Sequence, residues 1–366
     1  MKKVILMSLQ TEKLEISPAR YQLLDELADR GYETYVFING HLKQRKQFTS
    51  ICHVINVRTM SNKEIRNKIR DISPQVVIAS TYEDMDAIYF LPWCMKKTAF
   101  YYYNLEIYTL YMPKEQRFDE WRIHFRSICL YLCNKTKEII YTKKIEAFTI
   151  QDEMRKQISA KYHISHKNTL LIPNSYTFDD TKIRDNPGEG VIYTGAVLRW
   201  ALSEQLDELV RVKNIPLTLA GWIDPAYKKQ IDELKETNSN ITFVEQQLSP
   251  EEHTRYLQKY AVGLIWYGIS QDENIRYMGL SSGKMFKYLS MGKPVIAVKC
   301  PGITNEIRKY KIGIVINSIS QLEDAYCRIM KKYAYYQKNV IETYKKIYDY
   351  KLVIQPFLDY IDNNLR

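Results

Sequence analysis

A lysine-bearing segment in the second half of the chain carries the clearest chemistry in this sequence. It begins at Ser281 and reads Ser-Ser-Gly-Lys-Met-Phe-Lys-Tyr-Leu-Ser-Met-Gly-Lys-Pro-Val. A loop that runs into a helix offers free backbone N–H groups and the positive end of the helix dipole, which together favour a diphosphate. Lys284 adds positive charge there, and Gly292 lets the helix end in a left-handed cap. We therefore expect Ser282, Gly283 and Lys284 to contact a diphosphate.

Strand-like and helix-like segments must position this loop, and they alternate along the whole chain. Apolar runs such as 4–9, 76–79 and 99–103 suit buried strands, and amphipathic segments separate them. This alternation predicts an α/β protein in which helices cover parallel sheets. A length of 366 residues is natural for two such cores. We expect two Rossmann-like parallel-sheet domains, with the carboxyl ends of their strands facing a cleft.

An acidic stretch with few large apolar residues interrupts the alternation near the middle of the chain. It runs from Phe178 to Gly190 and is typical of an interdomain linker. The predicted division is an N-terminal domain over 1–177, a linker over 178–190, a C-terminal domain over 191–345 and a final helix over 346–366. One arrangement we consider for the final helix is a crossing back to the N-terminal domain.

The second half resembles the nucleotide-sugar-binding domain of GT-B glycosyltransferases, especially the family-4-like enzymes. The segment from Ser281 is similar to the family pattern Pro-x-Lys-x-x-Glu-Tyr-Leu-x-x-Gly-Lys-Pro-Val. Short loops elsewhere in this half agree with the resemblance, because each follows a predicted strand. The resemblance assigns to the donor site the loop residues Gly195, Arg199, Gly221 and Gln246.

The chain departs from the family pattern at Lys287, where a glutamate usually binds the ribose hydroxyls. A lysine side chain cannot accept hydrogen bonds. Either Glu273 or Asp272 supplies the carboxylate, or the nucleotide lies differently, so we keep Lys287 and Glu273 among the expected donor-binding residues. Ser282 likewise replaces the usual proline of the pattern.

The first half resembles the acceptor-side domain of the same enzymes more faintly, through Tyr102 to Tyr108 and Ile172 to Ser175. An inverting enzyme needs a general base for the acceptor hydroxyl. Glu106, Asp84 and Glu83 are the carboxylates that we expect to face the cleft from this half, and Glu106 and Asp84 are the catalytic candidates. A purely structural role is the alternative for each of them.

The pair Asp84 and Asp86 also has the D-x-D spacing of a divalent-metal motif. It lies in the first half of the chain, whereas the lysine segment lies in the second, and an exposed loop or helix start explains it more simply. The six histidines show no metal-binding spacing. We therefore expect no metal.

The resemblance implies a metal-independent glycosyltransferase that uses a nucleotide sugar, with a UDP-sugar as the first choice and no further cofactor. The acceptor is expected to be a glycan, a lipid-linked molecule or a protein, in the synthesis of surface polysaccharide or glycoconjugates. A non-catalytic GT-B subunit that binds a partner or a glycan is one alternative, and Lys287 favours it. A nucleotide-sugar epimerase is another, although the carboxylates and histidines that it needs are not readable here.

Basic residues are in excess, mainly in the first half. The formal net charge is +11, and residues 1–175 hold 27 Lys and Arg against 19 Asp and Glu. A helix expected over 117–133 carries Trp121, Phe125 and Leu132 on one stripe, flanked by arginines. Either this stripe belongs to the core, or the surface docks on anionic lipid. No basic helix or RNP-type motif points to nucleic acid.

Localisation is inferred from what the sequence lacks. The six cysteines form no C-x-x-C, the N-terminus shows no secretory signal, and no apolar run approaches a membrane span. We expect a cytoplasmic protein, with peripheral attachment to the inner face of the plasma membrane as the alternative that the charge suggests.

Overall fold

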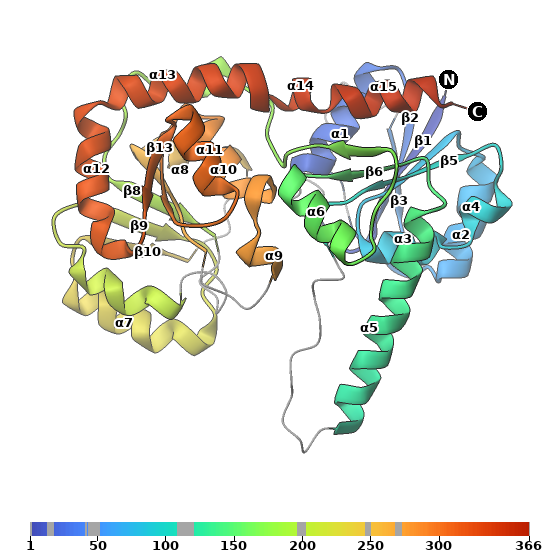
Figure 1. Ribbon diagram of the computed structural model, residues 1–366, viewed down its shortest axis with the longest axis horizontal. Helices are drawn as coiled ribbons and strands as arrows, with labels where there is room; N and C mark the ends of the chain where they lie inside the picture. The colour runs from blue at the N-terminus through green and yellow to red at the C-terminus, as the bar shows by residue number, and fades with distance from the viewer. Residues whose placement is uncertain are drawn as a thin grey trace. The chain divides into compact units, whose positions relative to one another are not determined.

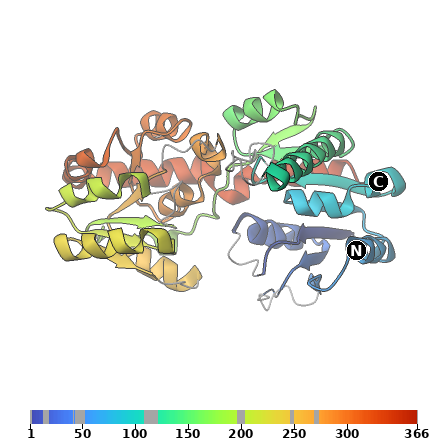
Figure 2. The same ribbon diagram turned by 90° about the horizontal axis from the view of Figure 1, so that it is seen from below.

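The computed structural model describes residues 2–12, 18–40, 42, 52–107, 121–195, 203–245, 250–267 and 273–365. The chain forms two compact units, Met1–Pro173 with Val353–Arg366, and Asn174–Leu352 (Figures 1 and 2). The division falls slightly before the expected boundary at 177. Residues 178–190, where the sequence predicts a linker, belong to the second unit.

The first unit is built on seven parallel strands in the order β3-β2-β1-β4-β5-β6-β7. Strands β4 and β5 are buried along their whole length, as their apolar sequences predict for strands covered on both faces. A capping box of Ser61 and Glu64 starts α2. The elements are β1 (Lys3–Ser8), α1 (Pro18–Asp29), β2 (Glu33–Ile38), β3 (Cys52–Asn56), α2 (Asn62–Ile72), β4 (Val76–Ala79), α3 (Tyr82–Ile88), α4 (Leu91–Cys94), β5 (Ala99–Tyr103), α5 (Trp121–Thr142), β6 (Ala147–Ile150), α6 (Glu153–Lys161), β7 (Thr169–Leu171) and α15 (Gln355–Asn363).

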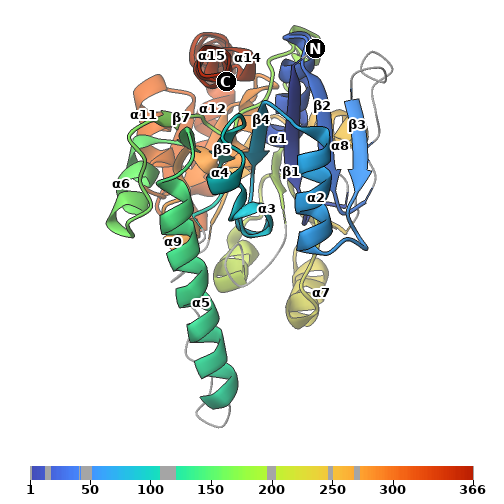
Figure 3. The same cartoon turned by 90° about the vertical axis from the view of Figure 1, so that its right-hand side faces the viewer.

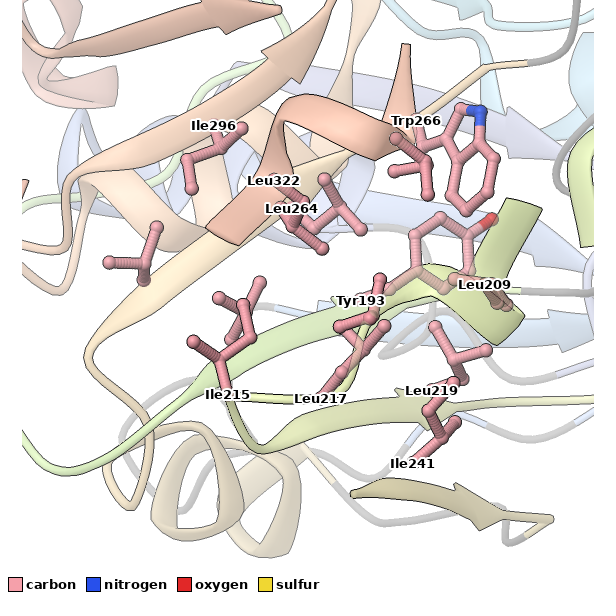
Figure 4. Packing of buried hydrophobic residues seen from close by; sticks show 14 of the residues in the cluster. Tyr193, Leu209, Ile215, Leu217, Leu219, Ile241, Leu264, Trp266, Ile296 and Leu322 are labelled. Atoms are coloured by element: carbon pink, nitrogen blue, oxygen red, sulfur yellow. The ribbon is translucent and has the colours of Figure 1, made fainter. Parts of the chain in front are cut away.

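The second unit is built on six parallel strands in the order β10-β9-β8-β11-β12-β13. Tyr193, Leu217, Leu264 and Trp266 pack together in its core (Figure 4). The elements are η5 (Asp180–Lys182), β8 (Val191–Thr194), η6 (Ser203–Arg211), β9 (Leu217–Ala220), η7 (Pro225–Tyr227), α7 (Lys228–Thr237), β10 (Ile241–Val244), α8 (Pro250–Leu257), β11 (Val262–Ile265), α9 (Glu273–Arg276), η8 (Gly279–Ser281), α10 (Gly283–Leu289), β12 (Val295–Val298), α11 (Ile303–Tyr310), β13 (Gly313–Ile316), η9 (Ile319–Gln321), α12 (Leu322–Lys331), α13 (Tyr333–Thr343) and η10 (Tyr344–Tyr348); α14 (Tyr350–Val353) ends where the first unit resumes.

Helix α10 packs directly on strand β11 because the strand has a glycine at the contact. A Cβ atom on Gly263 would lie 2.3 Å from the ring of Tyr288, so no larger residue fits without moving the helix. The Tyr288 hydroxyl accepts a hydrogen bond of 2.8 Å from the backbone N–H of Thr194, at the end of β8. These contacts fix α10 against the carboxyl end of the central strands.

Helix α5 extends well beyond the other elements of the first unit (Figures 1 and 3). It continues to Thr142, past the end at residue 133 that the sequence predicts. Phe125 is 63% exposed and Leu132 is 52% exposed, so these two positions of the apolar stripe are not part of the core. The side chain of Trp121 lies outside the described residues.

The last helix, α15, belongs to the first unit and lies beside α1 (Figure 1). The Arg30 guanidinium, which follows α1, donates to Asp359 at 2.6 Å and to Asp362 at 2.5 Å. Phe357 is fully buried, and its ring centroid lies 5.6 Å from that of Tyr101 on β5. The C-terminal segment thus returns to the first unit, at residue 353 rather than at 346.

We predict that Phe357→Ala destabilises the first unit and frees α15. Removing a fully buried phenylalanine loses its transfer free energy and leaves a cavity, which together cost about 3–5 kcal/mol. Urea unfolding followed by far-UV circular dichroism measures the effect. Leu352→Ala is the matched control, because that side chain is 50% exposed. An unchanged midpoint for Phe357→Ala would contradict this account of the C-terminal return.

Candidate functional site

The Lys284 ammonium lies among aromatic rings at the carboxyl end of the second sheet. Its Nζ donates to the hydroxyl of Tyr193 at 2.8 Å. The same nitrogen lies 4.3 Å from the centre of the Tyr193 ring and 4.6 Å from that of Tyr267. Tyr193 comes from β8 and Tyr267 follows β11, so neighbouring strands supply the two walls. Ring faces attract a cation, but they do not neutralise it.

No carboxylate of the described residues forms an ion pair with Lys284. Burial lowers the pKa of its ammonium to about 7, because the charged form loses water without gaining a negative partner. An anion placed next to Nζ would restore the missing charge and raise this pKa again. The surroundings of the Lys284 ammonium therefore favour a negatively charged ligand.

Two glycines make room for the lysine stem. A Cβ atom on Gly195 would lie 2.5 Å from Cε of Lys284, and one on Gly221 would lie 2.2 Å from the carbonyl oxygen of Gly195. Both glycines have positive φ angles, 141° and 152°, which other residues rarely adopt. Their N–H groups bond to the carbonyl groups of Ala220 and Val244. The glycines therefore supply space rather than hydrogen-bond donors.

The loop before α10 is held by side chains that cap and anchor it. The Ser282 hydroxyl accepts from the N–H of Met285 at 3.3 Å and bonds to the Tyr267 hydroxyl at 2.8 Å. Asn174 donates its side-chain amide to the carbonyl oxygen of Ser281 at 3.1 Å. This loop is thus fixed in place, and Lys284 is presented from a rigid helix start.

The structure brings together three of the residue sets that the sequence assigned to the donor. Gly195, Gly221 and the Ser282–Gly283–Lys284 turn meet at one place, although they come from separate parts of the chain. Lys287 is partly buried on the same helix, and burial, followed by the charge of Lys182, lowers the pKa of its ammonium to about 8. Glu273 opens the short helix α9 and is partly exposed. Arg199, Gln246 and Asp272 lie outside the described residues.

The two tyrosines that surround the lysine cannot be identified as site residues from the sequence alone. Tyr193 belongs to a predicted strand, and Tyr267 belongs to no motif. The only available signal was position, because each lies at or just after the end of a strand that borders the predicted site. Asn174 was quoted only as part of a resemblance.

Asp84 has a structural role, which corrects its assignment as a catalytic base. The carboxylate is buried, and its oxygens accept from the N–H groups of Leu9 at 2.7 Å, Ser80 at 2.9 Å and Thr81 at 2.9 Å. These three bonds hold the carboxylate inside the first unit, so it is not exposed to a substrate.

The D-x-D pair is divided between two structural contacts. Asp86 pairs with Lys137 at 2.5 Å, while Asp84 caps α3. The described residues contain no group of three metal-ligating side chains. Glu106 is exposed just after β5, and its N–H bonds to the side-chain oxygen of Asn104 at 3.1 Å. It remains the candidate base of the first unit.

Part of the second unit is similar to a known protein family. Residues 191–352 match the family model described as "Glucosyltransferase 3-like, C-terminal domain". No curated protein sequence matches the chain.

Solved structures share the fold over the whole length. HepE from Anabaena, solved with UDP, superposes with a TM-score of 0.70 at 11% identity, over 99% of this chain and 100% of its own. A glycosyltransferase from Rickettsia africae gives 0.70 at 12% identity, over 99% and 98%. WaaG, a glycosyltransferase of lipopolysaccharide biosynthesis, gives 0.63 at 11% identity, over 96% and 98%. The chain therefore has the GT-B fold, and its residues 191–352 are similar to the C-terminal domain of glucosyltransferase 3-like proteins.

Proposed function

We propose that this protein is a glycosyltransferase that takes a sugar from a nucleotide-sugar donor, a UDP-sugar, and transfers it to a glycan, a lipid-linked molecule or a protein. The observation that carries the proposal is Lys284, whose ammonium has no carboxylate partner among the described residues and whose side-chain stem packs closely against Gly195. HepE, which shares the fold, was solved with UDP and with UDP-glucose.

Lys284 can stabilise the leaving group of this reaction. Breaking the bond between sugar and diphosphate leaves additional negative charge on the diphosphate oxygens. A partly buried ammonium that Tyr193 already orients stabilises that charge without reorganising. The Lys284 side chain thus supplies the positive charge that a divalent cation supplies in other enzymes. For this reason we propose transfer without metal.

Glu106 is the residue that we propose as general base toward the acceptor hydroxyl, should the reaction invert the anomeric centre. It is exposed at the carboxyl end of β5, where open α/β sheets bind ligands. Asp84 is not proposed for this role, because its carboxylate accepts hydrogen bonds from backbone N–H groups.

A non-catalytic subunit is the second candidate, and Lys287 favours it because a lysine stands where a ribose-binding glutamate is expected.

Mass spectrometry with a panel of nucleotide sugars, run in the presence of a chelator, distinguishes the candidates. We expect transfer or slow hydrolysis of a UDP-sugar without metal. Epimerised donor would indicate the epimerase alternative. Donor left intact throughout would favour the binding subunit, and activity that returns only with manganese or magnesium would refute metal independence.

The acceptor side of the proposal includes an anionic membrane surface on the cytoplasmic side. Phe125 and Leu132 are exposed on α5, and Leu130 on the same helix is 60% exposed. The helix sequence carries four basic residues and one acidic residue. Exposed apolar side chains combined with positive charge suit the interface of an anionic bilayer. Among the helices that the structure describes, none has the length and apolarity of a transmembrane span.

The first prediction here concerns Lys284. Losing one charged hydrogen bond costs about 1.5–3 kcal/mol, so Lys284→Met should weaken UDP binding about tenfold to a hundredfold in calorimetry. Binding requires the ammonium form, whose pKa is about 7 in the free protein. Affinity of the wild type should therefore fall as the pH rises above 7.

The Lys284→Met variant should lose this pH dependence, because the ionisation of UDP itself is common to both proteins. Lys229→Met, an exposed lysine on α7, is the control and should bind as the wild type does. Wild-type affinity in Lys284→Met would remove the basis of the proposed donor site.

The second prediction concerns α5. The wild type should sediment with anionic vesicles and not with neutral ones, and high salt should release it, because each basic residue near the surface contributes about 1 kcal/mol. The double variant Phe125→Ser with Leu132→Ser should sediment less, whereas Leu352→Ser, also an exposed leucine, should not differ from the wild type. Indifference of the wild type to both vesicle types at low salt would indicate a soluble acceptor.

A further inference from the structure

The second unit has a cavity at the amino edge of its sheet, where β13 begins. Its volume is about 340 Å³, within the range of about 300–1,000 Å³ that ligand pockets occupy. Helix α11, the start of β13 and the junction between α12 and α13 surround it, and these elements contact one another. The side chains that line it are Ile307, Arg308, Lys311, Lys332, Tyr335 and Tyr336.

Three of the lining side chains are cations, and the described lining contains no acid. Arg308 lies in the last turn of α11, Lys311 follows that helix, and Lys332 lies between α12 and α13. None of the three side chains forms an ion pair or a hydrogen bond with a residue that the structure describes. Three positive charges therefore surround one cavity without a matching negative charge.

The acidic residues of the neighbouring helices have partners elsewhere, and none of them lines the cavity. Their contacts are Glu306 with the Tyr348 hydroxyl, Glu323 with the backbone N–H of Asn214 at 2.8 Å, Asp324 with Arg328 at 3.4 Å, and Glu342 with Lys338 at 3.9 Å. The acids of α11, α12 and α13 are thus not available to neutralise the three cations.

Helix dipoles offset part of this positive charge. Helices α11 and α12 both end next to the cavity, and each carboxyl end of a helix carries the equivalent of about half a negative charge. Three full positive charges exceed what two helix ends offset. The remaining charge favours an anionic ligand, and phosphate oxygens accept readily from guanidinium and ammonium donors.

The backbone conformation of Lys311 is a second, independent feature of the cavity. Its φ of 54° and ψ of 41° lie in the left-handed region, which glycine adopts at lower cost than a residue with a side chain. The Asn339 side-chain amide donates to the Lys311 carbonyl oxygen at 3.1 Å and so holds this turn. A lysine at a position where glycine is more stable suggests a use for its charge.

Aromatic side chains form another wall of the cavity. Tyr335 is 46% exposed, and its ring centroid lies 5.4 Å from that of Tyr336 in an edge-to-face arrangement. Tyr336 in turn packs against the buried core of the second unit. These rings can contact the organic part of a ligand while the cations hold its phosphate groups.

We propose that this cavity binds a small phosphorylated molecule. Its phosphate groups lie among Arg308, Lys311 and Lys332, and its organic part packs on Tyr335. The site is separate from Lys284, because the cavity lies at the amino edge of the sheet, whereas Lys284 lies at the carboxyl edge beside Tyr193. A ligand in the cavity therefore does not compete with the diphosphate that we propose at Lys284.

Calorimetry with inorganic pyrophosphate tests the cavity in the Lys284→Met protein, in which the other proposed anion site is removed. Adding Arg308→Gln should weaken pyrophosphate binding about tenfold or more, because a charged hydrogen bond is lost. Adding Arg328→Gln is the matched control, because that guanidinium is exposed and already paired with Asp324. Undiminished binding after Arg308→Gln, or no pyrophosphate binding before it, would overturn the proposal.

Lys311→Gly separates a role in binding from a role in the fold. Without ligand, this variant should unfold at a higher temperature than the wild type, because glycine adopts the left-handed conformation without strain. Its pyrophosphate affinity should nevertheless fall about tenfold or more. A lower unfolding temperature, or an unchanged affinity, would mean that Lys311 serves the fold and would count against the site.

Two further probes distinguish the source of the phosphate. UDP binding by Lys284→Met that depends on Arg308 indicates a free phosphorylated molecule. Sedimentation with anionic phospholipid vesicles that depends on Arg308, without such UDP binding, indicates a lipid headgroup. The outcome is independent of the proposed function, because pyrophosphate binding through Arg308 in a protein that binds no UDP at Lys284 would keep the cavity and refute the donor site.

Discussion

An ammonium group withheld from water without a counter-charge is the constraint on which the candidate site depends. Lys284 is held between the rings of Tyr193 and Tyr267, and its pKa falls to about 7. Desolvation of the Lys284 ammonium costs free energy in the free protein, and a negative ligand at this place would offset that cost. A carboxylate beside Lys284 would stabilise the free protein and would compete with that ligand.

The second unit makes this arrangement rigid. Helix α10 packs so closely on β11 that Gly263 has no room for a side chain, and the Tyr288 hydroxyl ties the helix to the end of β8. Gly195 and Gly221 then approach each other and the lysine stem more closely than residues with side chains could. Bringing charge and space together in this way is preorganisation, which avoids rearrangement when a ligand binds.

The first unit uses its polar residues differently at the equivalent edge of its sheet. Strands β1 and β4 are neighbours in space but not in sequence, so their carboxyl ends form the switch point of the sheet. Asp84 spans this point by accepting from Leu9 and from Ser80. The Asp84 carboxylate, a catalytic candidate from the sequence, thus links the ends of these two strands. Glu106 is the exposed acid after β5.

The sequence alone determined the two parallel α/β units and the lysine turn, because buried strands, helix starts and glycine loops leave local patterns. It identified Gly195, Gly221 and Lys284 as parts of one site, although only through a resemblance. It could not show that Tyr193 and Tyr267 enclose Lys284, or that the Asp84 carboxylate is occupied by backbone groups. Each of these facts is a contact between segments far apart in the chain, and local periodicity carries no information about such contacts. Only the tertiary structure decided which charges are matched, since desolvation and pairing depend on the neighbours that folding supplies.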